Sequence, residues 1–246
     1  MKKLFSSFVF ALLALTAVAA DHNSAPSHYF LTPAQVLDSQ FFLELPPDTA
    51  SARYAFDVER YEEGKSLRDT PRGRRAVTDA NLSDGWLDRS FSDAFGFALT
   101  PENAPAIVSL LENMKEDAGD LATRSAKKHY MRPRPFMVFN EPSATPDHEN
   151  ELRKNGSYPS GHTAIGWATA LVLSEINPDA QAAIMKRGYD YGQSRVICGA
   201  HFQSDVDAGR LVGAAVVARL HADKNFQKKL AKAKKEFKRL SKRSSK

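Results

Sequence analysis

Hydrophobic positions recur at helical spacing along much of the 246-residue chain. Between residues 107 and 122 the apolar side chains follow one another at steps of three and four, which is the period of an amphipathic helix. The alternation typical of strands is weak everywhere, and the chain has no repeat or low-complexity segment. The pattern predicts an all-α fold, a multi-helix bundle of about eight to eleven helices.

Helix start signals place the individual elements. Thr32-Pro33 and Thr100-Pro101 each combine a capping side chain with a proline at the first helical position. Ser160, Asn177 and Ser204 are predicted to cap three consecutive helices farther along the chain. Together these signals predict a loop over 136–158 and helices over 33–45, 56–67, 101–127, 161–175, 182–197 and 205–220.

The first twenty residues have the pattern of a secretory signal peptide. Lys2 and Lys3 precede an apolar run over 8–15, and small side chains follow as far as Ala19 and Ala20, where we expect cleavage. The run is shorter than the roughly 20 residues of a spanning helix, which disfavours a membrane anchor. The sequence therefore predicts a periplasmic or secreted protein. Its expected organisation is a signal peptide over 1–20, one domain over 21–223 and a lysine-rich helix or tail over 224–246.

Charge is distributed unevenly between the predicted domain and the tail. Residues 224–246 hold eleven Lys and Arg against one Glu, whereas residues 21–223 hold 21 against 28 Asp and Glu. Nucleic-acid-binding proteins carry their basic surface on the fold, so no nucleic-acid partner is expected. The tail is interpreted as a solvated helix with a frayed end, and weak contact with anionic surfaces is the alternative. The spacing of Phe226, Leu230 and Phe237 leaves open that it docks on the body or on a second subunit.

The single cysteine limits the covalent chemistry of the chain. Cys198 has no second cysteine with which to form an intrachain disulfide. It follows Val196 and Ile197, so we interpret it as a small buried side chain and not as a reactive thiol.

Three cations are candidates for holding a phosphate group. Arg134 and Arg195 can bind phosphate oxygens through two parallel hydrogen bonds each, and Lys127 adds a point charge. Arg132 lies only two residues from Arg134, but it is interpreted as an ordinary surface residue because its spacing from Lys127 differs.

A second candidate cluster lies at a predicted helix N-terminus. Ser160 and Gly161 stand where unpaired backbone N–H groups and the helix dipole favour an anion, and Gly161 allows a close backbone approach. His162 follows directly and can act as an acid. The alternative is an ordinary serine cap beside a structural histidine.

A histidine and a carboxylate form the third cluster. His201 and Asp205 are four residues apart, so they share one face if this segment is helical. A carboxylate can hold a histidine in one tautomer and stabilise its cation. The alternative is a helix-capping aspartate beside a core histidine. Together the three clusters contain the groups needed to move a phosphoryl group without a metal.

The clusters match a known three-part motif. Lys127-x6-Arg134-Pro135, Pro159-Ser160-Gly161-His162 and Ser194-Arg195-x5-His201-x3-Asp205 resemble the motif shared by type 2 phosphatidic acid phosphatases and vanadium haloperoxidases. The run over 156–163 is similar to that of class A bacterial non-specific acid phosphatases, and the resemblance covers most of the mature chain. The clear departure is the lysine-rich end.

The resemblance implies a fold and a role for each residue. It implies the bundle of the acid phosphatase and haloperoxidase type, with His201 as the nucleophile that becomes phosphohistidine, Asp205 as its orienting group and His162 as the acid for the leaving alcohol. The phosphoryl oxygens would be bound by a set of five residues: Lys127, Arg134, Ser160, Gly161 and Arg195.

The sequence is thus interpreted as that of a non-specific acid phosphatase for small phosphomonoesters, active without a metal or other cofactor. Inorganic phosphate and vanadate are the expected inhibitors, transfer of phosphate to alcohols is expected, and so is a homodimer. Two alternatives remain: a haloperoxidase that holds vanadate with the same residues, and a non-enzymatic anion-binding surface protein. An integral lipid phosphatase is disfavoured because no second hydrophobic span is present.

Overall fold

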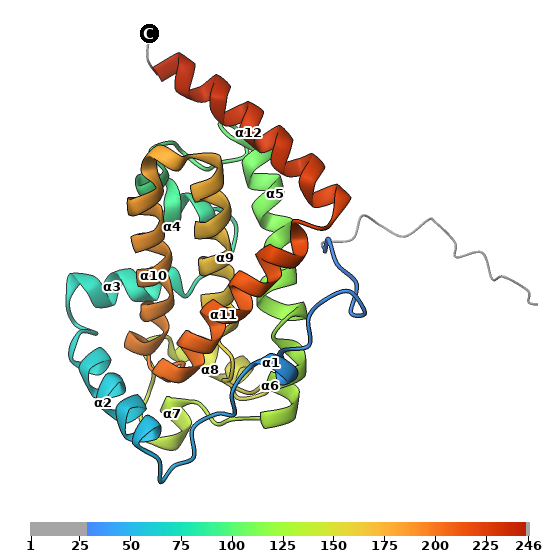
Figure 1. The fold of residues 1–246 in the computed structure, drawn as a ribbon. Coiled ribbons are helices and arrows are strands. Elements are labelled where there is room, and N and C mark those ends of the chain that lie inside the picture. Colours follow the sequence, from blue (N-terminus) through green and yellow to red (C-terminus); the bar gives the residue numbers. More distant parts are fainter. Residues whose placement is uncertain (1–28, 245–246) are drawn as a thin grey trace, which may run out of the picture.

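A computed structural model describes residues 29–244, so the predicted signal peptide lies outside the described residues. These residues contain no strand, which confirms the all-α prediction (Figure 1). The helix number exceeds the predicted eight to eleven because several helices are a single turn long. The α-helices within 29–244 are α1 Ser39–Phe42, α2 Ala52–Ser66, α3 Pro71–Asp79, α4 Trp86–Phe95, α5 Pro105–Glu116, α6 Arg124–Tyr130, α7 Pro135–Val138, α8 Glu149–Leu152, α9 Gly161–Ile176, α10 Gln181–Ile197, α11 Gln203–Leu220 and α12 Lys224–Ser244.

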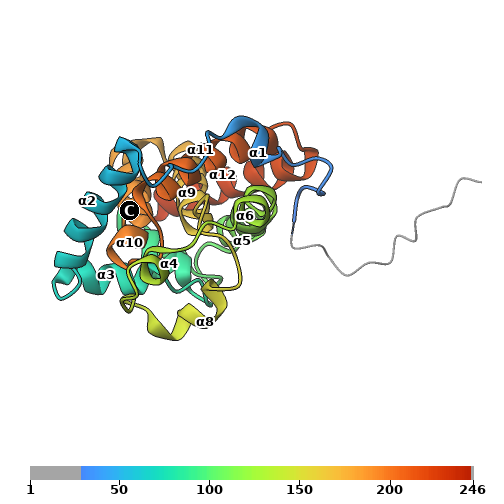
Figure 2. The ribbon, with the colours of Figure 1, turned by 90° about the horizontal axis from the view of Figure 1, so that it is seen from below.

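Helix α9 forms the centre of the bundle. It packs against α10 and α11, and most of its side chains are buried. Small residues let the three helices approach closely: a Cβ atom at Gly166 would lie 2.3 Å from the Tyr191 ring on α10, and one at Gly213 on α11 would lie 2.7 Å from the Ala164 carbonyl oxygen. Helices α2, α3 and α4 pack on α10, and α5 runs beside α9 (Figures 1 and 2).

The three helices at the centre are those that the sequence predicted best. Ser160 caps α9 as expected, because its hydroxyl accepts a hydrogen bond from the Thr163 amide at 3.3 Å. Helix α10 follows a short 3₁₀ turn over Pro178–Ala180 and ends at Ile197, as predicted. Helix α11 begins at Gln203, two residues before the predicted start, because the Asp205 carboxylate accepts the Phe202 amide proton at 2.9 Å and closes the first turn.

The Thr-Pro start signals were wrong in both places. The Thr32 carbonyl closes a turn with the amides of Gln35 and Val36, and the only helix between 33 and 45 is the single turn α1. The Thr100 carbonyl closes a second turn with the Asn103 and Ala104 amides, and α5 begins at Pro105. In both places the threonine and proline form a tight turn instead of a helix start.

The long helix predicted over 101–127 is interrupted. A π-helical turn, η1 (Asp117–Leu121), follows α5, and α6 then begins at Arg124. The buried Asp117 carboxylate accepts the backbone N–H groups of Phe30 and Leu31 at 2.9 and 3.0 Å. Burial raises the pKa of Asp117 to about 6. The widened turn therefore lies where the N-terminal segment is attached to the bundle.

Other departures from the prediction are local. Helix α2 begins four residues earlier than expected, at Ala52, because Ser51 caps it. Helices α3 and α4 were not predicted. The predicted loop over 136–158 contains most of α7, a 3₁₀ turn over Pro146–His148 and all of α8.

Helix α12 is docked, so the interpretation of this segment as a solvated helix was wrong; the predicted frayed end at 245–246 lies outside the described residues. Its apolar stripe buries Phe226, Leu230 and Ala233 against the body, and α12 packs mainly on α5 (Figure 1). The Glu236 carboxylate accepts the Ala106 and Ile107 amides at 2.9 and 3.0 Å, at the N-terminus of α5. The alternative that the stripe docks on the body is the one observed.

Two further expectations concern burial and hydropathy. Cys198 is fully buried, as predicted, and burial raises the pKa of its thiol. Within the described part of the chain, no helix is both long and apolar enough to cross a membrane.

Candidate active site

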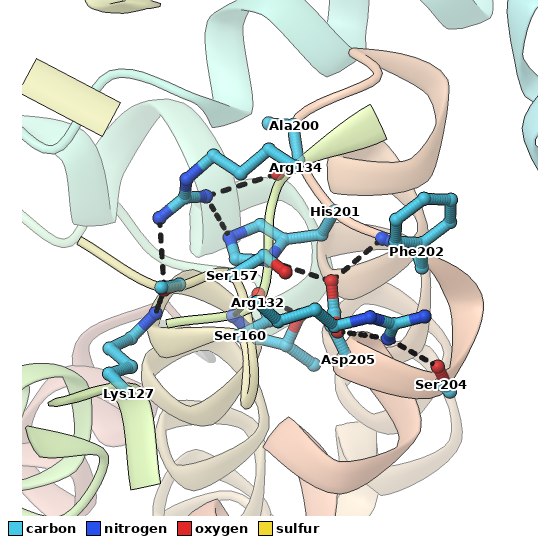
Figure 3. Close-up of polar contacts among 12 residues, drawn as sticks. Lys127, Arg132, Arg134, Ser157, Ser160, Ala200, His201, Phe202, Ser204 and Asp205 are labelled. Carbon is cyan, nitrogen blue, oxygen red and sulfur yellow. Dashed lines mark hydrogen bonds and ion pairs between the residues drawn. The ribbon is translucent and has the colours of Figure 1, made fainter. Parts of the chain in front are cut away.

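The three sequence clusters meet at one end of the bundle, where α6, α9 and α10 and the segment before α11 come together. A cavity of about 400 Å³ opens there, with polar side chains on one part of its wall and Leu82 and Ile165 on another. Its polar lining includes Lys127, Arg134 and His162, and it also contacts His201. Figure 3 shows the polar contacts around this point.

His201 lies in the segment before α11 and is almost fully buried. Its Nε2 atom is 3.0 Å from Nη1 of Arg134. Because a guanidinium can only donate, Nε2 is the acceptor, and the proton of the neutral ring is assigned to Nδ1. Nδ1 in turn lies 3.5 Å from Oδ2 of Asp205. His201 precedes α11, so the condition for a shared helix face is not met, but the two side chains do meet.

Arg134 is held rigidly beside His201 (Figure 3). Its guanidinium donates to the Ala200 carbonyl at 3.0 Å, to the Leu152 carbonyl at 2.9 Å and to Oδ1 of Asn155 at 2.7 Å. Burial, and then the charge of Arg195, lowers the pKa of Arg134 to about 10. It remains a cation at neutral pH in spite of this environment.

Lys127 contributes a second cation from the last turn of α6. Its ammonium donates to the Gly156 carbonyl at 2.9 Å, in the loop that leads into α9. Burial, and then repulsion by Arg134, holds the pKa of Lys127 well below its usual value. An anion placed between these cations would reverse both effects, because opposite charge favours the protonated form.

Arg195 is the most unusual group of the site. It lies in the last turn of α10 and is completely buried, and none of its three guanidinium nitrogens has a hydrogen-bond partner within residues 29–244. Leaving a buried cation unpaired is costly, so such a group is expected to have a partner in the working protein. Together with burial, which is the larger cause, its charge lowers the pKa of both His162 and His201.

His162 is positioned differently from His201. It lies in the first turn of α9, and its Nε2 atom is 3.0 Å from the Ala80 carbonyl oxygen at the end of α3. A carbonyl only accepts, so the Nε2 proton is fixed and Nδ1 is the atom that can gain or lose a proton. Burial, and then the charge of Arg195, holds the pKa of His162 well below its usual value.

Ser160 and Gly161 form the N-terminus of α9 beneath the cavity. Ser160 is fully buried and uses its hydroxyl for the helix cap, and its amide donates to the Asp205 carbonyl at 2.9 Å. Gly161 is required by packing: a Cβ atom there would lie 2.6 Å from the Gly119 carbonyl oxygen in η1. This close approach brings the first backbone N–H groups of α9 to the cavity wall, where they favour an anion.

Arg132 was misjudged as a surface residue. It is buried and forms ion pairs with Asp57 on α2 at 2.8 Å and with Asp205 at 2.6 Å. Asp57, also fully buried, had not been singled out. No local pattern marks either residue, because their partners lie 73 and 75 residues away along the chain.

Comparison with known proteins shows the family of the chain. Residues 117–229 match the PAP2 superfamily. The chain is 51% identical to a non-specific acid phosphatase of Providencia stuartii, over 98% of this chain and 100% of the relative. It is 46% identical to a non-specific acid phosphatase of Salmonella typhimurium, over 91% and 90% of the two chains, and 36% identical to an acid phosphatase of Zymomonas mobilis, over 81% and 75%. The chain therefore belongs to the non-specific acid phosphatases of the PAP2 superfamily.

Proposed function

We propose that this acid phosphatase hydrolyses phosphomonoesters in two steps, through a phosphohistidine formed at Nε2 of His201. The tautomer supports this role, because Nε2 carries a lone pair and points to the cationic side of the cavity. The observation that carries the proposal is the buried, unpaired guanidinium of Arg195, whose charge acts on both histidines. A phosphate group would supply the negatively charged hydrogen-bond partner that this guanidinium lacks.

Substrate binding would use positive charge already fixed in the fold. The phosphoryl oxygens contact Lys127, Arg134 and Arg195 together with the N–H groups at the start of α9. The phosphoryl group takes the place of Nε2 as a partner of Arg134, which frees the lone pair for attack. Charge spread over the phosphoryl oxygens in the transition state is then stabilised without reorganisation of the site.

In the first step, Nε2 of His201 attacks phosphorus while the bond to the ester oxygen breaks. The ring becomes cationic, and its Nδ1 proton faces the Asp205 carboxylate, which stabilises the charge. His162 gives its Nδ1 proton to the departing alkoxide, so that a neutral alcohol leaves. In the second step, a water molecule attacks phosphorus, His162 takes up the water proton, and inorganic phosphate and neutral His201 are released.

The proton on His162 would depend on the substrate. In the empty site, burial and Arg195 disfavour the cationic ring. A bound phosphate dianion offsets both effects and raises the pKa of His162, so the acid is charged when it is needed. We therefore expect the activity to peak on the acidic side of neutrality and to fall as His162 loses its proton.

Hydrolysis of p-nitrophenyl phosphate against pH, with and without EDTA, tests the proposal. We expect an acidic optimum and no effect of EDTA, since Lys127, Arg134 and Arg195 supply the charge. An alkaline optimum or an absolute metal requirement would contradict it. Vanadate and inorganic phosphate should inhibit, whereas bromide oxidation as the main activity with vanadate would favour the haloperoxidase alternative.

Four finer predictions accompany the proposal. Phosphate should pass to a concentrated alcohol, because an acceptor can replace water in the second step. Export rests on the signal-peptide pattern, and the homodimer remains to be measured. Weak binding to anionic surfaces is supported by a row of exposed cations on α12 at helical spacing: Lys228, Lys232, Lys235, Arg239 and Lys242.

A further inference from the structure

A buried ionic network lies behind the proposed nucleophile, on the side away from Arg134 (Figure 3). Nη1 of Arg132 donates to Oδ1 of Asp205 at 2.6 Å and to the Ser204 hydroxyl at 2.8 Å. Its Nη2 donates to Oδ2 of Asp57 at 2.8 Å. Asp57, Arg132 and Asp205 are each at most 8% exposed. We call these three residues the Asp57–Arg132–Asp205 network.

The network fixes the direction of the Asp205 carboxylate. Oδ1 of Asp205 bonds to Arg132, while Oδ2 accepts the Phe202 amide at 2.9 Å and faces Nδ1 of His201. Each oxygen therefore has its own partner, and rotation of the carboxylate would break two short hydrogen bonds at once. Because charge-assisted bonds in a buried site are strong, the carboxylate has one favoured orientation.

Arg132 is itself fixed from several directions. Its guanidinium carbon lies 4.4 Å from the centre of the Phe202 ring, and its carbonyl accepts the Ser157 amide at 2.9 Å, which attaches the loop before α9. The second carboxylate, Asp57, also accepts the Ser204 amide at 2.8 Å in the first turn of α11. The network thus connects α2, the segment after α6 and α11 directly behind His201.

We infer that Arg132 and Asp57 are positioning residues that hold the Asp205 carboxylate against Nδ1 of His201 and keep Nε2 aimed at phosphorus. The inference rests on the proposed role of His201 as nucleophile. A small error in the direction of attack is costly, because a displacement of about 1 Å can reduce a rate about 100-fold. Phosphate binding, in contrast, depends on Lys127, Arg134 and Arg195 and does not involve the network.

The network also tunes the charge near His201. This ring is faced by Lys127 from α6, Arg134 from the segment before α7, His162 from α9, Arg195 from α10 and Asp205 from α11. The Ser157 backbone and the Asp205 carboxylate favour its protonation, and Arg132 offsets part of that carboxylate's charge. Removing Arg132 should shift the acidic limb of the kcat/KM profile to higher pH, and neutralising Asp57 should shift it to lower pH. Loss of fold stability alone shifts neither limb.

Rapid-quench formation of phosphohistidine from a labelled phosphate ester tests the inference. The variants are Arg132→Met, Arg132→Lys and Asp57→Asn in the full mature chain. Glu236→Ala is the control, since it removes a buried charge at the far end of the bundle. We expect Arg132→Met to slow phosphohistidine formation about 100-fold, when the rate is divided by the number of sites that bind phosphate. Inhibition by inorganic phosphate should change little. Arg132→Lys should recover part of the rate, and the control should label at the parent rate.

Different results would contradict the proposed nucleophile and the proposed positioning residues. If the parent enzyme never carries label on His201, the proposed function is wrong. If the parent is labelled but Arg132→Met and Asp57→Asn label at the parent rate per binding site, the positioning role is wrong. It is also wrong if the limbs of the kcat/KM profile stay fixed in both variants, because a purely structural ion pair would change only the amount of folded protein.

Discussion

Buried charged side chains lie at two ends of this helical body, and their hydrogen bonding differs. Figure 1 shows the helices at these two ends. Where α12 meets α5, the Glu236 carboxylate accepts two backbone N–H groups of α5, so charge and helix terminus satisfy each other. At the opposite end, Arg195 is even more deeply buried, but its guanidinium has no hydrogen-bond partner among the described residues. The Glu236 arrangement is complete within the fold, whereas the Arg195 guanidinium would be completed by the phosphate group that we propose binds there.

The difference separates groups that stabilise the fold from groups that act on a ligand. A satisfied buried charge lowers the free energy of the folded chain. An unsatisfied one raises it and persists where it is needed for another task. The depressed pKa values of Lys127, His162 and His201 belong to the second kind, because burial and like charges disfavour the protonated form of each. Substitutions at the two ends should therefore have opposite consequences for activity and stability.

The largest effect expected in this comparison is at His162. His162→Ala removes the proton donor, so hydrolysis of an alkyl phosphate should fall by roughly 10²–10⁴-fold. The loss with p-nitrophenyl phosphate should be smaller, because p-nitrophenolate leaves without a proton. Steady-state kinetics with both esters measures the ratio, and an equal loss with both would remove His162 from the role of acid.

Arg195→Met should separate binding from stability. Without the guanidinium, inhibition by inorganic phosphate should weaken by about 10- to 100-fold, the value of a strong charge-assisted hydrogen bond. The phosphate-free variant should melt at a higher temperature than the parent, since a costly buried charge is gone. The pKa of His162 should rise, which moves the alkaline limb of the pH profile to higher pH. A lower melting temperature would show that Arg195 is satisfied within the fold.

The buried histidines at the cavity should make the phosphate-free enzyme unstable in acid. The pKa values of His162 and His201 lie well below 6.5 in the folded state and near 6.5 in the unfolded state, so the unfolded chain binds more protons as pH falls. Stability is therefore lost below about pH 6.5, by up to about 1.4 kcal/mol per pH unit for each ring. Asp117, with a pKa of about 6, takes up a proton in the folded state and offsets part of this loss.

Urea unfolding at several pH values, with and without inorganic phosphate, measures this effect. Phosphate should suppress the acid-dependent loss, because it restores favourable surroundings for the protonated rings. A stability profile that is flat between pH 6.5 and 5 without phosphate would contradict the account.

The smallest effect is expected at the other end. Glu236→Ala leaves the Ala106 and Ile107 amides without their partner and should cost about 1–3 kcal/mol of unfolding free energy. Turnover of p-nitrophenyl phosphate per folded molecule should stay at the parent value, because the cavity lies at the opposite end of α5. A kcat loss in folded enzyme would show that the two ends are coupled.

The sequence predicted the helices around the cavity better than those that surround them. Ser160 caps α9 through the neighbouring Thr163 amide, so its local pattern was sufficient. Asn177 precedes a 3₁₀ turn before α10, and its side chain donates instead to the distant Phe95 carbonyl. Thr32 and Thr100 have the same local chemistry but close turns. The choice between turn and helix start depends on packing that is absent from the pattern.

Prediction of the candidate site was limited in the same way, because a local pattern does not contain tertiary contacts. The residues of the three motifs could be named because their spacing is characteristic, and the fold brings them to one end of the bundle. Arg132 and Asp57 could not, since an ion pair between α2 and the segment after α6 is defined only by the tertiary structure. The contact of His201 with Asp205 was anticipated, and so was a break between the two helices in which His201 lies, although α11 begins two residues earlier than predicted.

The central claim is that His201 accepts the phosphoryl group, and acid-sensitive labelling tests it most directly. The parent enzyme is mixed with a labelled phosphate ester, quenched in base and digested, and the labelled peptide is sequenced. The account predicts an alkali-stable, acid-labile label on His201 that is absent from His201→Ala and forms no more slowly than the alcohol is released. Label on another residue, or steady turnover with no labelled enzyme at any time, would contradict it.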